Sequence, residues 1–273
     1  MNRYTWRSLI LEISLILAAV VFFIPFVILA SVALRDTNGD AGFLGFTWPL
    51  NFGNFGTAWT QAAMGPSILN SLMITSVSVV LIIAVSSTAA YTLTRSTQRW
   101  SKGVFYLLLV GFIFPGQLAL VPLYLAFASV GLVGSPIAVI LINVAGFVPF
   151  AVFLYSVFLR DLPKDYEEAA VIDGARPLWM FKAVVFPLLR PVTGTVSILT
   201  ALAIWNDFFT PLLYLSGSGT QTAPLSVYTF VSQYGANWPL VFSTLIISVI
   251  PILIAYFLMQ RFIMKGFASG LKG

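Results

Sequence analysis

Long apolar runs alternate with shorter polar segments along the whole chain. Each run has about 20 or more predominantly apolar residues, which is the length of an α-helix that crosses the hydrocarbon core of a bilayer. The runs predict six transmembrane helices, at residues 9–34, 68–93, 104–127, 136–159, 192–215 and 240–262. We therefore expect an all-α membrane protein in which residues 1–273 form a single transmembrane domain.

Residues 160–191 are the one long charged interruption in the second half of the chain. They hold ten of the 23 charged residues (14 basic and 9 acidic), so this segment cannot lie in hydrocarbon. Asp165 followed by Glu168 has the spacing of a capping box, and Gly174 suits the left-handed end of a helix. The pattern predicts a short helix over residues 166–173, outside the membrane.

A second short helix is predicted to follow within the same segment. Pro177 suits its first turn, and Pro187 and Pro191 are expected to close it off. On the first helix Ala169 and Ala170 form a face with almost no side-chain bulk, beside acidic side chains. Such a face suits the cleft of another protein, while the alternative is a solvated connecting loop. Composition alone leaves both interpretations open.

Composition narrows the class of protein. Hydrophobic residues make up 59% and charged residues 8%, against roughly a quarter charged in soluble domains. The absence of Cys and His excludes disulfides, thiol nucleophiles, Cys or His metal sites and imidazole proton relays. The chain also lacks the G-x-x-x-x-G-K-[ST] loop that holds nucleotide phosphates. We expect no catalytic residue, no metal site and no cofactor in this chain, and any ATP that drives it should be bound by another subunit.

The basic residues predict the orientation of the chain. Thirteen of the 14 lie on one side of the six-helix arrangement, and Arg35 falls on the other. By the positive-inside rule the basic side is the cytoplasm. Both termini and residues 160–191, which lie between the fourth and fifth helices, are then cytoplasmic. Residues 35–66, 128–135 and 214–239 are expected to face outward.

Asp207 is the only acidic residue deep in a predicted span. A carboxylate in a membrane-spanning helix costs about 2.5–3.5 kcal/mol on insertion, so it should face protein or a water-filled path. Asn206 and Asp207 are therefore candidates for polar groups that line a translocation pathway. The alternative is a structural role, in which Asp207 holds Asn206 or a polar group of a neighbouring subunit.

The order of residues in the charged segment resembles a known motif, the EAA loop of the inner-membrane permeases of binding-protein-dependent ABC importers. The matching positions are Glu168 to Ala175, followed by Phe181, Pro187 and Pro191. The chain looks most similar to the carbohydrate-uptake branch, of the maltose or multiple-sugar type. Further positions resemble that branch: Asn51, Asn54, Phe55, the string from Trp205 to Asp207, and the C-terminal Lys-Gly-Phe pattern.

The resemblance implies a role for each matched segment. The loop at 160–191 would carry a coupling helix that docks in a cleft of a separate ATPase subunit, which binds ATP and Mg. The implied coupling residues are Glu167, Glu168, Ala169, Ala170, Asp173 and Gly174. The implied partners are a second homologous permease subunit, two copies of the ATPase, an extracytoplasmic solute-binding protein, a carbohydrate substrate and the lipid bilayer. The implied location is the bacterial cytoplasmic membrane, and no nucleic acid is expected.

Two other classes of function fit the sequence less well. A carrier coupled to ions or protons needs titratable groups inside the membrane, and Asp207 with Glu12 near a helix end is a small supply. A structural or insertion factor does not explain the small-residue helix. The sequence thus favours one permease subunit that forms half of a translocation pathway, and it leaves the transported sugar open.

Overall fold

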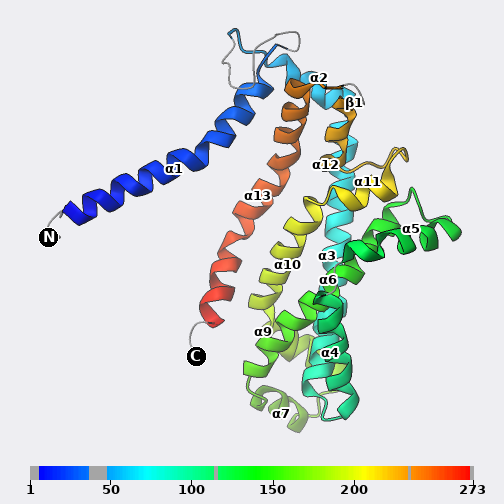
Figure 1. Cartoon of the computed structure of the whole chain (residues 1–273). Helices are drawn as coiled ribbons and strands as arrows, with labels where there is room; N and C mark the ends of the chain where they lie inside the picture. Colours follow the sequence, from blue (N-terminus) through cyan, green and yellow to red (C-terminus); the bar gives the residue numbers. More distant parts are fainter. Residues whose placement is uncertain (1–5, 37–47, 114–115, 233–234, 271–273) are drawn as a thin grey trace. The chain divides into compact units, whose positions relative to one another are not determined.

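The computed structural model describes residues 6–36, 48–113, 116–232 and 235–270, and nearly all of its regular structure is helical (Figure 1). Contacts divide the chain into two units. The first unit comprises Met1–Gly65 and Ser226–Val249, and the second comprises Pro66–Leu225 and Ile250–Gly273.

The first unit contains helices, one short hairpin and the beginning of the last helix. Its strands pair antiparallel, with Val231 opposite Ala236 and Ser232 opposite Gly235. Its elements are α1 (Trp6–Ala33), α2 (Gly53–Gln61), the 3-10 helix η3 (Val227–Phe230), β1 (Val231–Ser232), β2 (Gly235–Ala236) and the first turns of α13 (Trp238–Gly270).

Asn54 of α2 fastens the end of α1 within the first unit. The last carbonyls of a helix have no partner inside the helix, so other groups must bond them. The Asn54 amide nitrogen donates to the carbonyls of Ala33, at 2.9 Å, and Arg35, at 2.6 Å. The Ser243 hydroxyl also donates to the Ala33 carbonyl, at 3.1 Å. Asn54 is only 3% exposed. Asn54 is one of the positions that resemble the carbohydrate-uptake permeases, and its buried hydrogen bonds give it a structural role.

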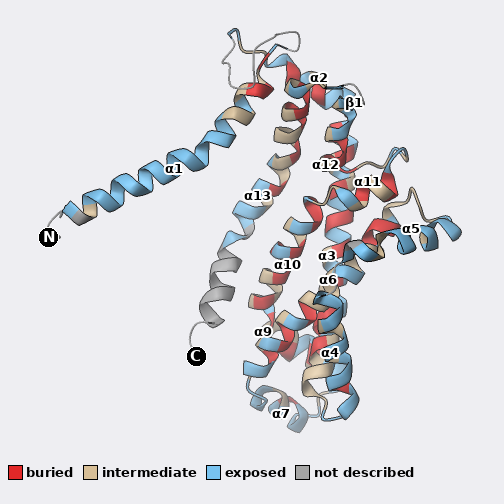
Figure 2. Ribbon diagram, in the orientation of Figure 1, coloured by how far each residue is buried: buried red, intermediate tan, exposed pale blue. Residues whose placement is uncertain are grey.

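The second unit is a bundle of helices around α6, and Figure 2 shows buried residues along that helix. α6 contacts α4, α10 and α11. The elements of the unit are α3 (Met64–Arg95, whose first two residues lie in the first unit), α4 (Arg99–Ile113), η1 (Gly116–Ala119), α5 (Leu120–Ser129), α6 (Pro136–Asp161), α7 (Asp165–Ile172), α8 (Pro177–Met180), the π-helix η2 (Phe181–Val185), α9 (Phe186–Leu188), α10 (Arg190–Trp205), α11 (Phe209–Leu215), α12 (Ala223–Ser226, which ends in the first unit) and the part of α13 from Ile250 onward.

Small hydroxyl residues help α3 pack in the second unit. Ser78, Ser86 and Ser87 of α3 are buried, and the Ser86 hydroxyl donates to the Val148 carbonyl of α6 at 3.4 Å. Small side chains allow two helices to approach closely and to hydrogen-bond across the gap. The packing role expected of these residues therefore needs no bound solute.

Four of the predicted spans are long continuous helices. Among the described residues, the helices long and apolar enough to cross a membrane are Ser8–Ala33, Met64–Arg95, Pro136–Asp161 and Trp238–Leu258. They match the first, second, fourth and sixth predicted spans. α6 begins where expected because Ser135 caps it: its hydroxyl accepts from the Ile137 N–H at 3.2 Å, and Pro136 occupies the first turn.

The other two predicted spans, 104–127 and 192–215, each contain more than one helix. In the third span α4 ends at Ile113 and α5 begins at Leu120, and Pro115 lies outside the described residues. In the fifth span α10 ends at Trp205 and α11 begins at Phe209. The number of crossings, six, stays a prediction.

Candidate functional site

The charged loop contains the expected short helix, α7, over Asp165–Ile172. Its start differs from the prediction. Lys164 is the N-cap residue, it has helical backbone angles, and its carbonyl accepts from the N–H groups of Glu167 and Glu168 at 2.8 and 3.0 Å. Asp165 is the first residue inside the helix, so the predicted capping box on Asp165 and Glu168 is wrong. The three acidic side chains of the first turn still lie at the positive end of the helix dipole.

Gly174 ends α7 in the way the sequence predicted. Its φ angle is +77°, in the left-handed region that other residues enter at a cost. The Gly174 N–H donates to the Val171 carbonyl at 3.0 Å, and the Ala175 N–H donates to the Ala170 carbonyl at 2.9 Å. These two bonds form a Schellman motif, which satisfies the last carbonyls of the helix and turns the chain toward α8.

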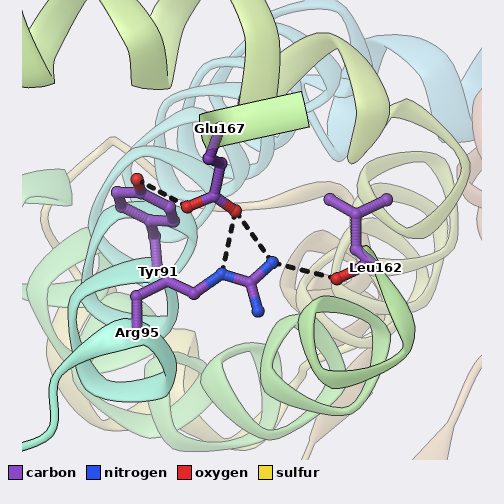
Figure 3. Close-up of polar contacts among 4 residues, drawn as sticks. All are labelled: Tyr91, Arg95, Leu162 and Glu167. Atoms are coloured by element: carbon purple, nitrogen blue, oxygen red, sulfur yellow. Dashed lines mark hydrogen bonds and ion pairs between the residues drawn. The ribbon is translucent and has the colours of Figure 1, made fainter. Parts of the chain in front are cut away.

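Glu167 faces inward and binds the end of α3 (Figure 3). Nε and Nη2 of Arg95 both lie 2.8 Å from Oε1 of Glu167, and the Tyr91 hydroxyl donates to Oε2 at 3.1 Å. Nη2 of Arg95 also donates to the Leu162 carbonyl at 3.1 Å. The two charged side chains are mostly buried, with 14% of Arg95 and 12% of Glu167 exposed. Buried charge-assisted bonds of this kind are short and directional.

An apolar layer lies beside this ion pair. Phe181 of η2 is buried, and its ring centroid lies 5.4 Å from that of Tyr91 and 6.0 Å from that of Phe186. α7 contacts η2, and Ala170 is only 7% exposed. Ala169 is exposed and Ala170 is nearly buried, and both line one hollow of the loop, so the expected small-residue face is accessible mainly at Ala169.

The solvent-exposed surface of the loop carries apolar side chains next to charged ones. Ile172 is 86% exposed, and Val171, Leu178 and Trp179 are also exposed. Glu168, Asp173 and Gly174 are exposed beside them. One hollow of about 520 Å³ is lined by residues of the loop that include Tyr166, Ala169, Ala170, Asp173, Gly174, Arg176 and Trp179. A second, of about 420 Å³, is lined by Arg95, Lys164, Glu167, Glu168, Val171, Ile172 and Met180.

Asn206 and Asp207, the second pair of candidate residues, lie at the break between α10 and α11. Oδ1 of Asp207 accepts from the N–H groups of Phe209 at 3.0 Å and Thr210 at 3.2 Å, so this side chain caps α11. The Asn206 amide donates back to the Leu202 carbonyl at 2.8 Å, and its side chain is exposed. The structure thus adds backbone partners for Asp207 that neither sequence interpretation named.

Sequence reasoning did not single out Tyr91 and Arg95 as part of the site. Tyr91 lies inside the predicted span 68–93, and Arg95 lies in the polar segment that follows it. The available signal was their spacing of four residues, which places both side chains on one face of a helix end. Their partner Glu167 is more than 70 residues further along the chain, and spacing does not reveal such a pairing.

Known proteins match this chain over most of its length. Residues 83–268, more than half of the chain, match the family described as "Binding-protein-dependent transport system inner membrane component". The melibiose/raffinose/stachyose import permease protein MelC of Bacillus subtilis is 35% identical over 268 residues, which cover 97% of each chain. The diacetylchitobiose uptake system permease protein NgcG of Streptomyces coelicolor is 30% identical over 94% of this chain and 86% of its own.

A solved structure shares the fold. It is a chain of a bacterial ABC transporter involved in the import of the acidic polysaccharide alginate, and it superposes with a TM-score of 0.78. The match covers 96% of this chain and 99% of the other at 19% sequence identity.

Proposed function

Since this chain belongs to the family of binding-protein-dependent transport system inner membrane components, we propose that it is a membrane-spanning subunit of an ATP-driven importer for a carbohydrate. It is a multi-pass protein of the bacterial inner membrane and a transport permease, not an enzyme. The observation that carries the proposal is the family match, which includes all of residues 160–191, here called the α7 loop. Relatives named for the import of oligosaccharides support a carbohydrate as the solute.

The α7 loop is the part of the chain that fits contact with an ATPase. Its solvent-exposed surface has apolar residues, among them Ile172 and Trp179, next to exposed Glu168 and Asp173. Large apolar side chains in water-exposed loops are typical of protein interfaces. Glu168, Ala169, Asp173 and Gly174 would then contact the partner. Glu167 and Ala170, which face inward, would hold the helix in position.

The complete transporter would contain further subunits. We expect a second homologous permease, two copies of an ATPase that binds ATP and Mg, and an extracytoplasmic solute-binding protein. The α7 loop and both termini would be cytoplasmic, where ATP is available. Arg3 and Lys272, two of the basic residues behind this orientation, lie outside the described residues.

The rival function, a carrier coupled to ions or protons, has less support. It needs acidic groups inside the membrane, and the predicted spans offer only Asp207 and, near a helix end, Glu12. The relatives are permease subunits of uptake systems, which favours the importer.

Purification from the native membrane tests the function. The tagged chain is extracted in mild detergent, and we expect an ATPase and a second permease to purify with it. The complex is then placed in liposomes with its binding protein, and uptake of labelled oligosaccharides is measured with ATP inside the vesicles. A chain that purifies alone and takes up solute in response to an ion gradient would contradict the proposal.

A further inference from the structure

We propose that Tyr91 and Arg95 of α3 and Glu167 of α7, here called the α3–α7 clamp, make α3 the membrane helix that moves with the loop. The inference rests on the proposed function, in which α7 receives movement from an ATPase. It assigns Arg95 and Tyr91 a role as positioning residues that pass this movement to α3.

The clamp joins three separate segments at one guanidinium group. Arg95 binds Glu167 of α7 through two nitrogens and the Leu162 carbonyl, which precedes α7, through one of them. Tyr91, one turn earlier on α3, binds the other carboxylate oxygen. All four contacts are 3.1 Å or shorter, and both charged side chains are mostly buried. The bonds therefore resist competition from water.

The clamp matters because α7 is short. A helix of eight residues is not stable alone, so its position depends on its contacts. The chain itself connects α7 through α8, η2 and α9 to α10, with a bend of 75° between Pro177–Leu188 and Arg190–Trp205. α3, in contrast, is 72 residues away along the chain at the Arg95–Glu167 pair. Side-chain contacts such as the clamp are therefore the direct physical link between α7 and α3.

The opposite end of α3 is also fastened within the second unit. The Asn70 amide donates to the Gln221 carbonyl at 3.1 Å, and the Ala223 N–H donates to the Ser71 hydroxyl at 2.8 Å. α3 has 32 residues, which corresponds to a length of about 48 Å at 1.5 Å per residue. A displacement of α7 can thus reach residues 221–223, near the far end of α3, through one rigid element.

The first test compares two arginines of the same basic segment. Arg95→Gln removes the charge of the clamp, while Arg99→Gln removes an exposed charge four residues later. We expect both variants to retain the ATPase on purification. In liposomes, uptake per ATP hydrolysed should fall about 2- to 30-fold in Arg95→Gln, the range found for residues that carry coupling. It should stay at the wild-type value in Arg99→Gln. Equal values for the two variants would overturn the proposal.

The second test restores the link by a different chemistry. The chain has no Cys, so Arg95→Cys with Glu167→Cys introduces a single thiol pair, to be joined by short bifunctional thiol reagents. We expect uptake per ATP to be low in this double variant and to recover after cross-linking, whereas each single Cys variant should not recover. Recovery would show that the physical link matters and not the charge.

The outcomes separate this proposal from the proposed function. If uptake stays low although the cross-link forms, the clamp does not transmit movement, and the proposal is wrong. If Arg95→Gln does not accumulate in the membrane, Tyr91→Phe, which keeps the ion pair, is tested in its place. Wild-type uptake per ATP in Tyr91→Phe, together with failure of the cross-link to restore uptake in the double Cys variant, would overturn the proposal. Failure of the proposed function itself would appear earlier, because the wild-type chain would then purify without an ATPase.

Discussion

The carboxylate of Asp207 lies in the predicted fifth span, where contact with lipid would be costly. The structure places it at a break in the helix, where it accepts two backbone N–H groups that α11 would otherwise leave unbonded. The cap uses one oxygen of the carboxylate and does not require its negative charge. A mutation that keeps the oxygen but removes the charge therefore separates the two roles.

We predict different effects for two substitutions at this position. Asp207→Asn keeps an oxygen that can cap α11, so the protein should remain in the membrane with unchanged stability. Asp207→Ala removes the cap and should lower the free energy of unfolding by about 1 kcal/mol. Thermal unfolding in detergent and uptake in liposomes measure the two effects. Reduced uptake in Asp207→Asn would support a pathway role for the charge, and wild-type uptake would leave the residue as a cap.

Gly174 gives a second prediction at the scale of one residue. A side chain placed there meets no atom within 4 Å, so the cost of Gly174→Ala comes from the backbone alone. Because φ is +77°, this cost should be about 1–2 kcal/mol in the local stability of α7. Hydrogen exchange of the α7 amides measures it. The control is Gly103→Ala, in the helical interior of α4 with equally open space, which should stabilise its helix by about 0.5–1 kcal/mol. Unchanged exchange of the α7 amides in Gly174→Ala would contradict this account.

The sequence predicts the role of a residue correctly where that role depends only on its neighbours in the chain. Gly174 and Pro136 fall where helix-end rules place them, because those rules depend on local backbone geometry. The orientation of Ala170 and the partner of Glu167 were not predictable. Both depend on α3 and η2, which are far away in sequence or irregular, and an eight-residue helix with apolar and charged groups on several sides has no clear face.

At the scale of elements, the proline residues of the loop show a limit of sequence rules. Pro187 and Pro191 were expected to close a helix, but they lie in the first turns of α9 and α10. Proline fits a first turn as well as a position after a helix, since its missing N–H is not needed there. The sequence therefore indicates a boundary at each proline without saying on which side the helix lies.

The broken spans have a similar physical cause. An apolar run predicts that a segment crosses a membrane, and it contains no information on whether the helix is continuous. The break after Trp205 takes only three residues, and the Asp207 carboxylate accepts from the first N–H groups of α11, which the break frees. Irregular backbone at membrane depth must find such partners, in protein or in a water-filled cavity.

The two alanines of α7 test which face of the helix meets the partner. Ala169 is exposed and Ala170 is buried against the loop. Ala169→Trp should leave α7 intact, at a cost of only a few tenths of a kcal/mol in helix propensity. It should nevertheless reduce recovery of the ATPase, because the added ring fills the docking face. Ala170→Trp should disturb the packing on η2 and speed hydrogen exchange in the loop. Normal ATPase recovery with Ala169→Trp would mean that this face is solvated.

At the scale of the whole molecule, the open question of orientation has a direct test. All of the proposed functions of the α7 loop require it to be cytoplasmic, and the expectation rests on thirteen of fourteen basic residues. Because the chain contains no Cys, single cysteines can be placed without further changes. The structure shows which positions are exposed, and these are the positions where an introduced cysteine can be labelled.

We predict opposite labelling at two exposed positions. Thr97 lies between α3 and α4, and Ser216 follows α11. A membrane-impermeant thiol reagent should label Ser216→Cys in intact cells and Thr97→Cys only after the membrane is opened or inverted. Ser101→Cys is the control for burial: Ser101 is 1% exposed and its hydroxyl donates to the Gln98 carbonyl, so it should label slowly from either side. Rapid labelling of Thr97→Cys in intact cells would place the α3–α4 connection outside. It would then remove the α7 loop from the ATPase, because Arg95, at the end of α3, binds Glu167 directly.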